Sequence, residues 1–242
     1  MNLQIVERIK CSECPIRHRA VCSTCSDSEL QHLEKIKVYR SFAAGETIQW
    51  RGDESQFVSS VVKGIATLTK TLEDGRTQVV GLLLPSDFIG RPGREEAIFD
   101  VVAVTDVTLC CFDRKPFERL VVETPHLTQR LMEMALDELD AARDWMVLLG
   151  RKTAREKIAT FLEMVVRRSR VQDTKISNLS LPLTRDEIAD FLGLTLETVS
   201  RQLTALRKDG VIEFVDRRHF KVMDMAALQE ATGDDADGGL II

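Results

Sequence analysis

The 242-residue sequence is poor in aromatic residues, which make up 5% of it, with two Trp and a single Tyr. It also has no run of about 18 apolar residues, the length that a membrane-spanning helix requires. The opening stretch MNLQIVERIK contains neither the apolar segment nor the small-residue cleavage site of a secretory signal. We therefore expect a cytoplasmic protein with no membrane partner, in a compartment where thiols stay reduced and stable disulfides are rare.

Catalytic motifs are also missing. The stretches GRTQVV and SDFIG contain Gly and Ser but match no phosphate-binding loop. No Ser/His/Asp or Cys/His set carries the local signature of a nucleophilic enzyme. The sequence therefore predicts a protein that is not an enzyme.

Charge is unevenly distributed along the chain. The net charge is −5, but residues 151–222 hold 15 Lys and Arg against 10 Asp and Glu, so this segment is at +5 and the remainder at −10. A basic segment attached to an acidic body favours a nucleic-acid partner for the basic part.

Four of the six cysteines lie in the stretch CSECPIRHRAVCSTC, residues 11–25. Cys11, Cys14, Cys22 and Cys25 follow the spacing C-x₂-C-x₇-C-x₂-C, which is a complete tetrahedral set for zinc. Iron–sulfur clusters also take Cys thiolates, and a C-x-x-C pair supplies two of them from one turn of backbone. The spacing alone leaves both metal centres open, and it leaves His18 as an exposed loop residue or a further ligand.

The periodicity of the chain divides it into segments. Residues 1–27 read as a loop-rich arm, and 28–120 as a β-rich domain, in which Asp74-Gly75 marks a tight hairpin between two alternating runs. Strands at this spacing predict a sandwich or barrel, and we expect a double-stranded β-helix. We expect a long helix at 121–150, a DNA-binding domain at 151–225 and a disordered acidic tail at 226–242.

The long helix carries apolar residues at alternating steps of three and four. This spacing is the a/d seam of a coiled coil and favours self-association of two helices, although a helix packed on its own domain would show a related pattern. The expected dimer interface consists of Met132, Ala135, Leu139, Ala142, Met146 and Leu149.

Residues 183–214, LTRDEIADFLGLTLETVSRQLTALRKDGVIEF, predict a helix-turn-helix. Thr184 and Glu187 form a capping box, and Gly193 lies in the turn between two short helices. The second helix has Val199, Leu203 and Leu206 on its inward face and a polar, basic outward face, and the following VIEFVDRRHFKVMD alternates like a two-stranded wing. A plain helical hairpin with a solvated face explains fewer of these features.

With these elements in this order, the chain from about residue 11 to 225 resembles the CRP/FNR superfamily of bacterial transcription regulators. In LTLETVSRQL, the residues Glu197, Ser200 and Arg201 match the E-x-x-S-R triplet of the FNR branch, which implies that they read bases. The cyclic-AMP branch has an Arg-Ser pair after the turn DFIG; RPGREEAIFDVV lacks it, so we expect no cyclic nucleotide. Weaker contacts to the DNA backbone are expected from Thr184, Thr195, Thr198, Arg207 and Lys208.

The resemblance also implies a cofactor. FNR-type regulators hold an oxygen-labile 4Fe–4S cluster with three N-terminal cysteines and one from the β-domain. By this resemblance the ligands are Cys11, Cys14, Cys22 and Cys110, whereas Cys25 and Cys111 are surplus. The cluster would favour a homodimer that binds a TTGAT-N4-ATCAA palindrome when oxygen is low, with RNA polymerase as a further partner. The alternative is a redox-insensitive, FixK-like activator with zinc on the N-terminal cysteines.

Overall fold

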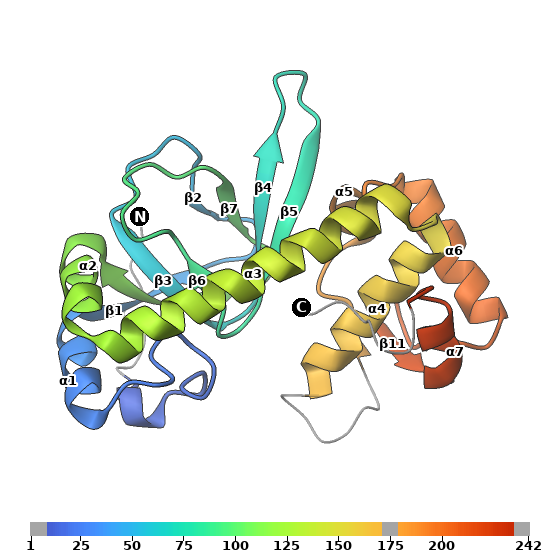
Figure 1. Cartoon of the computed structure of the whole chain (residues 1–242). Helices are drawn as coiled ribbons and strands as arrows, with labels where there is room; N and C mark the ends of the chain where they lie inside the picture. Colours follow the sequence, from blue (N-terminus) through green and yellow to red (C-terminus); the bar gives the residue numbers. More distant parts are fainter. Residues whose placement is uncertain (1–8, 171–178, 235–242) are drawn as a thin grey trace. The chain divides into compact units, whose positions relative to one another are not determined.

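The structure is a computed structural model that describes residues 9–170 and 179–234. It divides into two compact units, Met1–Ala135 and Leu136–Ile242. The long helix α3, Pro125–Arg151, contributes its first turns to one unit and its last turns to the other (Figure 1). No helix in the described part of the chain is both long enough and apolar enough to span a membrane.

The first unit is built on two four-stranded antiparallel sheets. Their strand orders are β1-β8-β3-β6 and β2-β7-β4-β5, so strands distant in sequence are neighbours in each sheet. This arrangement confirms the expected β-domain. The strands are β1 (Lys37–Phe42), β2 (Thr47–Gln49), β3 (Phe57–Lys63), β4 (Ala66–Thr71), β5 (Thr77–Leu83), β6 (Phe88–Ile89), β7 (Asp100–Ala103) and β8 (Val107–Asp113).

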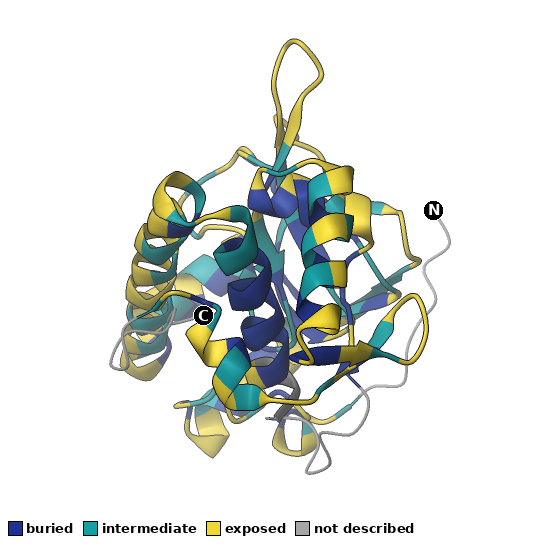
Figure 2. Cartoon of the chain, turned by 90° about the vertical axis from the view of Figure 1, so that its right-hand side faces the viewer, coloured by how far each residue is buried: buried dark blue, intermediate teal, exposed yellow. Residues whose placement is uncertain are grey.

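The β4–β5 hairpin turns at the expected dipeptide. Gly75 has φ 86°, a left-handed conformation that glycine adopts without strain, and the Leu72 amide donates to the Arg76 carbonyl at 2.8 Å. Residues 70–77 are all exposed, and the hairpin projects from its sheet (Figure 2). The predicted hairpin is confirmed, and its tip is open to solvent.

Each face of the first sheet packs against a different core because strand side chains alternate. Val61, Leu109 and Cys111 point into the apolar layer that includes residues of the second sheet, such as Val101. Val58, Cys110 and Phe112 point the other way, toward the N-terminal arm and the helices. The adjacent cysteines of β8 therefore belong to separate cores.

The core that contains Val58, Cys110 and Phe112 is covered by the arm, helix α1 (Asp27–Ile36) and helix α2 (Arg114–Glu123). The arm contains the short 3-10 helix η1 (Cys11–Glu13) followed by turns. Ser26 caps α1 in a reciprocal capping box with Glu29, and Leu30 and Leu33 are the buried residues of this helix. Leu127 of α3 is fully buried in the same core, so the start of α3 is anchored to the first unit.

Helix α3 leaves this core with much of its apolar surface uncovered. Met132, Leu139 and Met146 are 61%, 45% and 73% exposed, so the described part of the chain leaves these three seam residues largely uncovered. Ala135 and Ala142 are exposed as well, whereas Leu149 is only half-exposed and lies near Gly193. Leu136 and Val147, which the heptad count omitted, widen the exposed apolar stripe.

The second unit contains α4 (Ala154–Arg170), α5 (Arg185–Leu192), α6 (Leu196–Lys208), α7 (Met225–Glu230) and a three-stranded sheet. That sheet has the order β10-β11-β9, with β9 (Leu179–Ser180), β10 (Ile212–Phe214) and β11 (His219–Val222). The predicted two-stranded wing therefore gains a third strand, β9. Strand β9 has only two residues, which is too short for an alternating pattern to be recognised in the sequence.

Residues 226–234, expected to be part of a disordered tail, are structured. Helix α7 begins at the Asp224 cap, buries Leu228 completely and contacts α4. Asp234 pairs with the Lys152 ammonium at 2.6 Å. The acidic composition of the tail predicted disorder, but the single apolar side chain of Leu228 is enough to anchor the segment. Residues 235–242 lie outside the described part of the chain.

Candidate metal centre and nucleic-acid interface

Five of the six cysteines share one core. Cys11, Cys25 and Cys110 are buried in it, and Cys14 and Cys22 pack against it half-exposed; we call this group the cysteine core. None of these cysteines forms a disulfide. The fold therefore brings Cys110 of β8 to the arm cysteines, whereas Cys111 lies on the opposite face of the strand and accepts a hydrogen bond from Ser59 Oγ at 3.2 Å.

Three polar side chains organise the arm around these thiols. Arg17 donates to the carbonyls of Ser23 and Cys25, the latter at 2.8 Å, and so holds the loop that carries Cys22. Lys37 Nζ donates to Cys11 Sγ at 3.2 Å. The Tyr39 hydroxyl donates to the Ile9 carbonyl at 3.3 Å and lies within hydrogen-bonding reach of Cys14.

Burial favours the neutral form of three thiols of the cysteine core, those of Cys22, Cys25 and Cys110. Burial raises the pKa of Cys22 to about 11 and that of Cys25 to about 12, although the Arg17 guanidinium lowers both. Burial likewise raises the pKa of Cys110 well above its usual range, with Cys111 and Cys11 nearby adding to the effect. For both Cys22 and Cys25, burial therefore outweighs the effect of the Arg17 guanidinium on the pKa. Metal binding must therefore displace protons from these thiols.

One buried polar atom at this core has no partner. Ser60 lies opposite Cys110 across the β3–β8 pair, and its Oγ forms no hydrogen bond with any described residue. Buried hydroxyls are seldom left without a partner. A thiolate or an inorganic sulfide at Cys110 would accept from this hydroxyl, so the donor set and its surroundings fit an anionic sulfur-rich group.

In the described residues, the thiols of the cysteine core are not arranged around a common metal position. Within residues 9–170 and 179–234, no three His, Cys, Asp or Glu side chains are arranged to bind one metal ion. A metal site is seldom formed before its metal binds, so thiols packed among apolar side chains are not expected to converge on one point beforehand. His18 is exposed on the arm, as a loop residue would be.

The second unit presents the predicted helix-turn-helix. Thr184 and Glu187 form the reciprocal capping box of α5, and Gly193 ends that helix with φ 60° in the left-handed region. Thr195 caps α6, whose buried residues are Val199, Leu203 and Leu206. These features confirm the motif in detail.

The outward face of α6 carries the three expected base-reading residues. Glu197 and Arg201 are exposed and Ser200 is half-exposed, near the helix N-terminus, where a recognition helix reads base edges. The Thr195 Oγ1 accepts from the Thr198 amide at 3.2 Å and donates to Thr198 Oγ1 at 3.0 Å, so both hydroxyls shape the helix start. Arg207 and Lys208 are exposed in the last turn.

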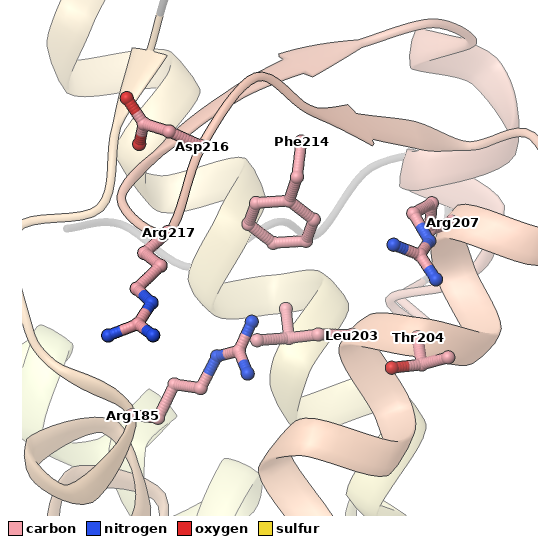
Figure 3. A pocket seen from close by; sticks show the side chains of 7 residues that line it. All are labelled: Arg185, Leu203, Thr204, Arg207, Phe214, Asp216 and Arg217. Atoms are coloured by element: carbon pink, nitrogen blue, oxygen red, sulfur yellow. The ribbon is translucent and has the colours of Figure 1, made fainter.

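Beside this face lies an open pocket of about 300 Å³. Three arginines surround it, and Figure 3 shows their guanidinium groups around the Phe214 ring. Arg185 is the first residue of α5, Arg207 lies in the last turn of α6, and Arg217 lies in the wing turn. None of these arginines forms a salt bridge with a described residue. The sequence analysis did not identify Arg185 and Arg217 as candidate DNA contacts. They are distant from Arg207 in sequence, and only the fold of α5, α6 and the wing brings the three cations together. The lining residues are Arg185, Leu203, Thr204, Arg207, Phe214, Asp216 and Arg217.

The segment after the turn DFIG, residues 91–102, carries charges of both signs: Arg91, Arg94, Glu95, Glu96 and Asp100. Glu95 and Glu96 are exposed in it, and the Glu118 carboxylate accepts from the Gly93 amide at 2.8 Å. The buried Arg114 is already paired with Glu95 at 3.3 Å and with Glu118 at 3.1 Å. The Arg114 guanidinium is therefore already engaged by two carboxylates and is not free to pair with a phosphate.

Known families and structures match both halves of the chain. The Crp-like helix-turn-helix domain matches residues 156–231, and the cyclic nucleotide-binding domain matches residues 39–124. The structure of FixK2 from Bradyrhizobium japonicum has a TM-score of 0.77 and 32% sequence identity, covering 83% of this chain and 100% of that one.

Relatives of nearly full length are also found. The transcriptional activator protein FnrL of Cereibacter sphaeroides is 61% identical over 96% of this chain and 95% of its own length. The nitrogen fixation regulation protein FixK of Bradyrhizobium diazoefficiens is 42% identical over 85% of this chain and 86% of its own. With a β-domain, a long helix and a DNA-binding helix-turn-helix in one chain, this protein belongs to the CRP/FNR family of transcription regulators and is an FnrL-like activator.

Proposed function

We propose that the protein is an oxygen-responsive regulator whose 4Fe–4S cluster is held by Cys11, Cys14, Cys22 and Cys110. The observation that carries this proposal is the burial of Cys110 in the same core as the arm cysteines, while Cys111 faces away. A zinc site made by the arm alone has no need of a β-domain thiol. When bound, the cluster supplies sensitivity to dioxygen.

The output is binding of a homodimer to DNA. The exposed apolar stripe of α3, with Met132, Leu139 and Met146 as its large members, is the surface that a second copy would cover. Two copies of α6 would then enter successive major grooves of a palindrome. Each half-site is TTGAT, with Arg201 on a guanine, Glu197 accepting from a base amine and Ser200 near a thymine.

Two further surfaces support this output. The arginines of the pocket beside α6 suit phosphates that flank the bases, because guanidinium groups pair with phosphate oxygens. The exposed tip of the β4–β5 hairpin, residues 72–77, is a candidate contact for RNA polymerase. The pairing of the buried Arg114 with Glu95 and Glu118 supports a regulator without a cyclic nucleotide.

The second candidate function is a redox-insensitive activator with zinc on Cys11, Cys14, Cys22 and Cys25. The observation in its favour is that Cys25 is buried in the cysteine core beside Cys22, as a fourth ligand would be.

Anaerobic purification separates the two candidates. The proposed regulator holds iron and acid-labile sulfide, binds the TTGAT palindrome without air, and loses both properties in air. The alternative holds zinc, and its binding is the same in both conditions. DNA binding in either case weakens as salt rises, because phosphate contacts release counterions.

A further inference from the structure

Lys37 brings a positive charge into the cysteine core. It is the first residue of β1, and its side chain is only 5% exposed. Its ammonium donates to Cys11 Sγ at 3.2 Å and to the Ile9 carbonyl at 2.5 Å, and it lies 5.4 Å from the centre of the Tyr39 ring. A buried ammonium is costly unless an anion compensates it.

The compensation within the described chain is weak. The carboxylate nearest to Lys37 Nζ belongs to Glu34, 3.5 Å away, and its side chain is 42% exposed. Water screens an ion pair of this kind, so it offsets little of the desolvation cost. The other partners of Lys37, a neutral thiol and a carbonyl oxygen, carry no net charge.

We propose that Lys37 is the counter-charge of the bound iron–sulfur cluster and sets its redox potential and its lifetime in oxygen. This inference rests on the proposed function, because it requires a cluster at Cys11 and Cys110. The four thiolates carry more negative charge than the iron–sulfide core carries positive charge, so the bound cluster is an anion. A cation held at Cys11 therefore stabilises it and favours the form that has one more electron.

The charge of Lys37 can be separated from its role as a tether. Lys37 joins Ile9 to β1, but the Tyr39 hydroxyl also donates to the Ile9 carbonyl, at 3.3 Å. The tether is therefore shared, whereas the ammonium is the cation that contacts a thiol of the cysteine core among the described residues. A variant that keeps the charge should preserve the potential, and a neutral variant of similar length should not.

The experiment compares full-length wild type, Lys37→Arg, Lys37→Met, Glu34→Gln and the control Lys35→Met, all purified without air. Lys35 is exposed in the last turn of α1. Iron and sulfide per chain, the midpoint potential of the cluster and its decay rate in air are measured. We expect a lower potential and roughly tenfold faster decay for Lys37→Met, a size that one unit charge within a few ångströms accounts for. Lys37→Arg and Lys35→Met should match wild type, and Glu34→Gln should shift the potential slightly upward.

Each outcome decides the inference. Equal potentials and decay rates in wild type and Lys37→Met overturn it while leaving the cluster in place. Loss of the cluster from both Lys37→Met and Lys37→Arg also overturns it, because charge would then not be what the site needs. Loss from Lys37→Met alone supports it. A wild-type protein without iron refutes the proposed function itself, and the inference falls with it.

Discussion

Ser60 and Cys110 lie directly opposite each other in the β3–β8 strand pair, and the buried Ser60 hydroxyl has no hydrogen-bond partner among the described residues. The neighbouring pair, Ser59 and Cys111, has the same register on the other face of the sheet, but there the hydroxyl donates to the sulfur at 3.2 Å. Two Ser–Cys pairs one residue apart thus differ in whether the hydroxyl is satisfied, and they provide matched controls for the cluster site.

Substituting these two serines should give opposite results. Ser60→Ala removes an unsatisfied buried hydroxyl, so the metal-free protein should be as stable as wild type or more stable, while the cluster loses a hydrogen bond and decays faster in air. Ser59→Ala should destabilise the fold by about 1 kcal/mol and leave cluster decay unchanged. Urea unfolding of metal-free protein and decay of the anaerobic protein in air measure both effects. Faster decay in Ser59→Ala than in Ser60→Ala would argue against a cluster at Cys110.

Arg201 should carry base specificity, and Lys208 should not. Arg201→Ala is expected to cost roughly 1–3 kcal/mol on the TTGAT palindrome and to flatten discrimination at the guanine. Lys208→Ala, at the last turn of α6, should weaken all sequences alike and reduce the salt slope by about 1 if it contacts a phosphate. Binding titrations on cognate and scrambled DNA at several salt concentrations measure both. An equal loss for Arg201→Ala on the two DNAs would contradict base reading by this residue.

The stripe on α3 should be a weak dimer surface that a larger side chain strengthens. Ala142 is exposed, and Ala142→Leu would add apolar area worth about 25 cal/mol per Å² if it is buried between two helices. A change of a few kcal/mol is enough to shift a population from monomer to dimer. We expect the variant to dimerise and to bind the palindrome in air, as judged by analytical ultracentrifugation and binding assays. A wild type that is already a tight dimer in air without a cluster would contradict a monomer–dimer switch.

The wing turn should depend on Asp216 down to low pH. The amides of Arg218 and His219 donate to its carboxylate at 2.7 and 2.8 Å, and with the His219 ring they lower its pKa from 3.8 to about 2. A lowered pKa means that the stabilisation is present above 3.8 and is lost as the pH falls through about 2. Asp216→Ala should loosen the turn that carries Arg217 and weaken DNA binding on all sequences. A carboxyl titration by NMR that gives an ordinary Asp216 pKa would contradict this account.

Local sequence rules were sufficient for several elements. The capping box of Thr184 and Glu187, the hairpin at Asp74-Gly75 and the long helix α3 each depend on residues close together in sequence, and the structure confirms all three. The apolar face of α6 was also predictable from the sequence, because its buried residues recur at the helical period.

The surroundings of the cysteines were not predictable in the same way. Lys37 and Tyr39 alternate on β1 and read as residues of a solvent-facing edge, but the aperiodic arm covers that face. Ser60 differs from Ser59 only in which side of the sheet it occupies, and this depends on the register with β8. Such contacts join residues that are distant in sequence, so no local pattern encodes them.

The ligand set is tested most directly by iron and acid-labile sulfide per chain in single Cys→Ser variants purified without air. Cys110 and Cys111 are adjacent on β8 but face different cores, and Cys25 shares a core with Cys110. We predict that Cys110→Ser loses the cluster, as do the substitutions at Cys11, Cys14 and Cys22, while Cys111→Ser and Cys25→Ser retain it. A Cys25→Ser protein without a cluster, together with a Cys110→Ser protein that keeps its metal, would contradict this account and place the metal on the four cysteines of the arm.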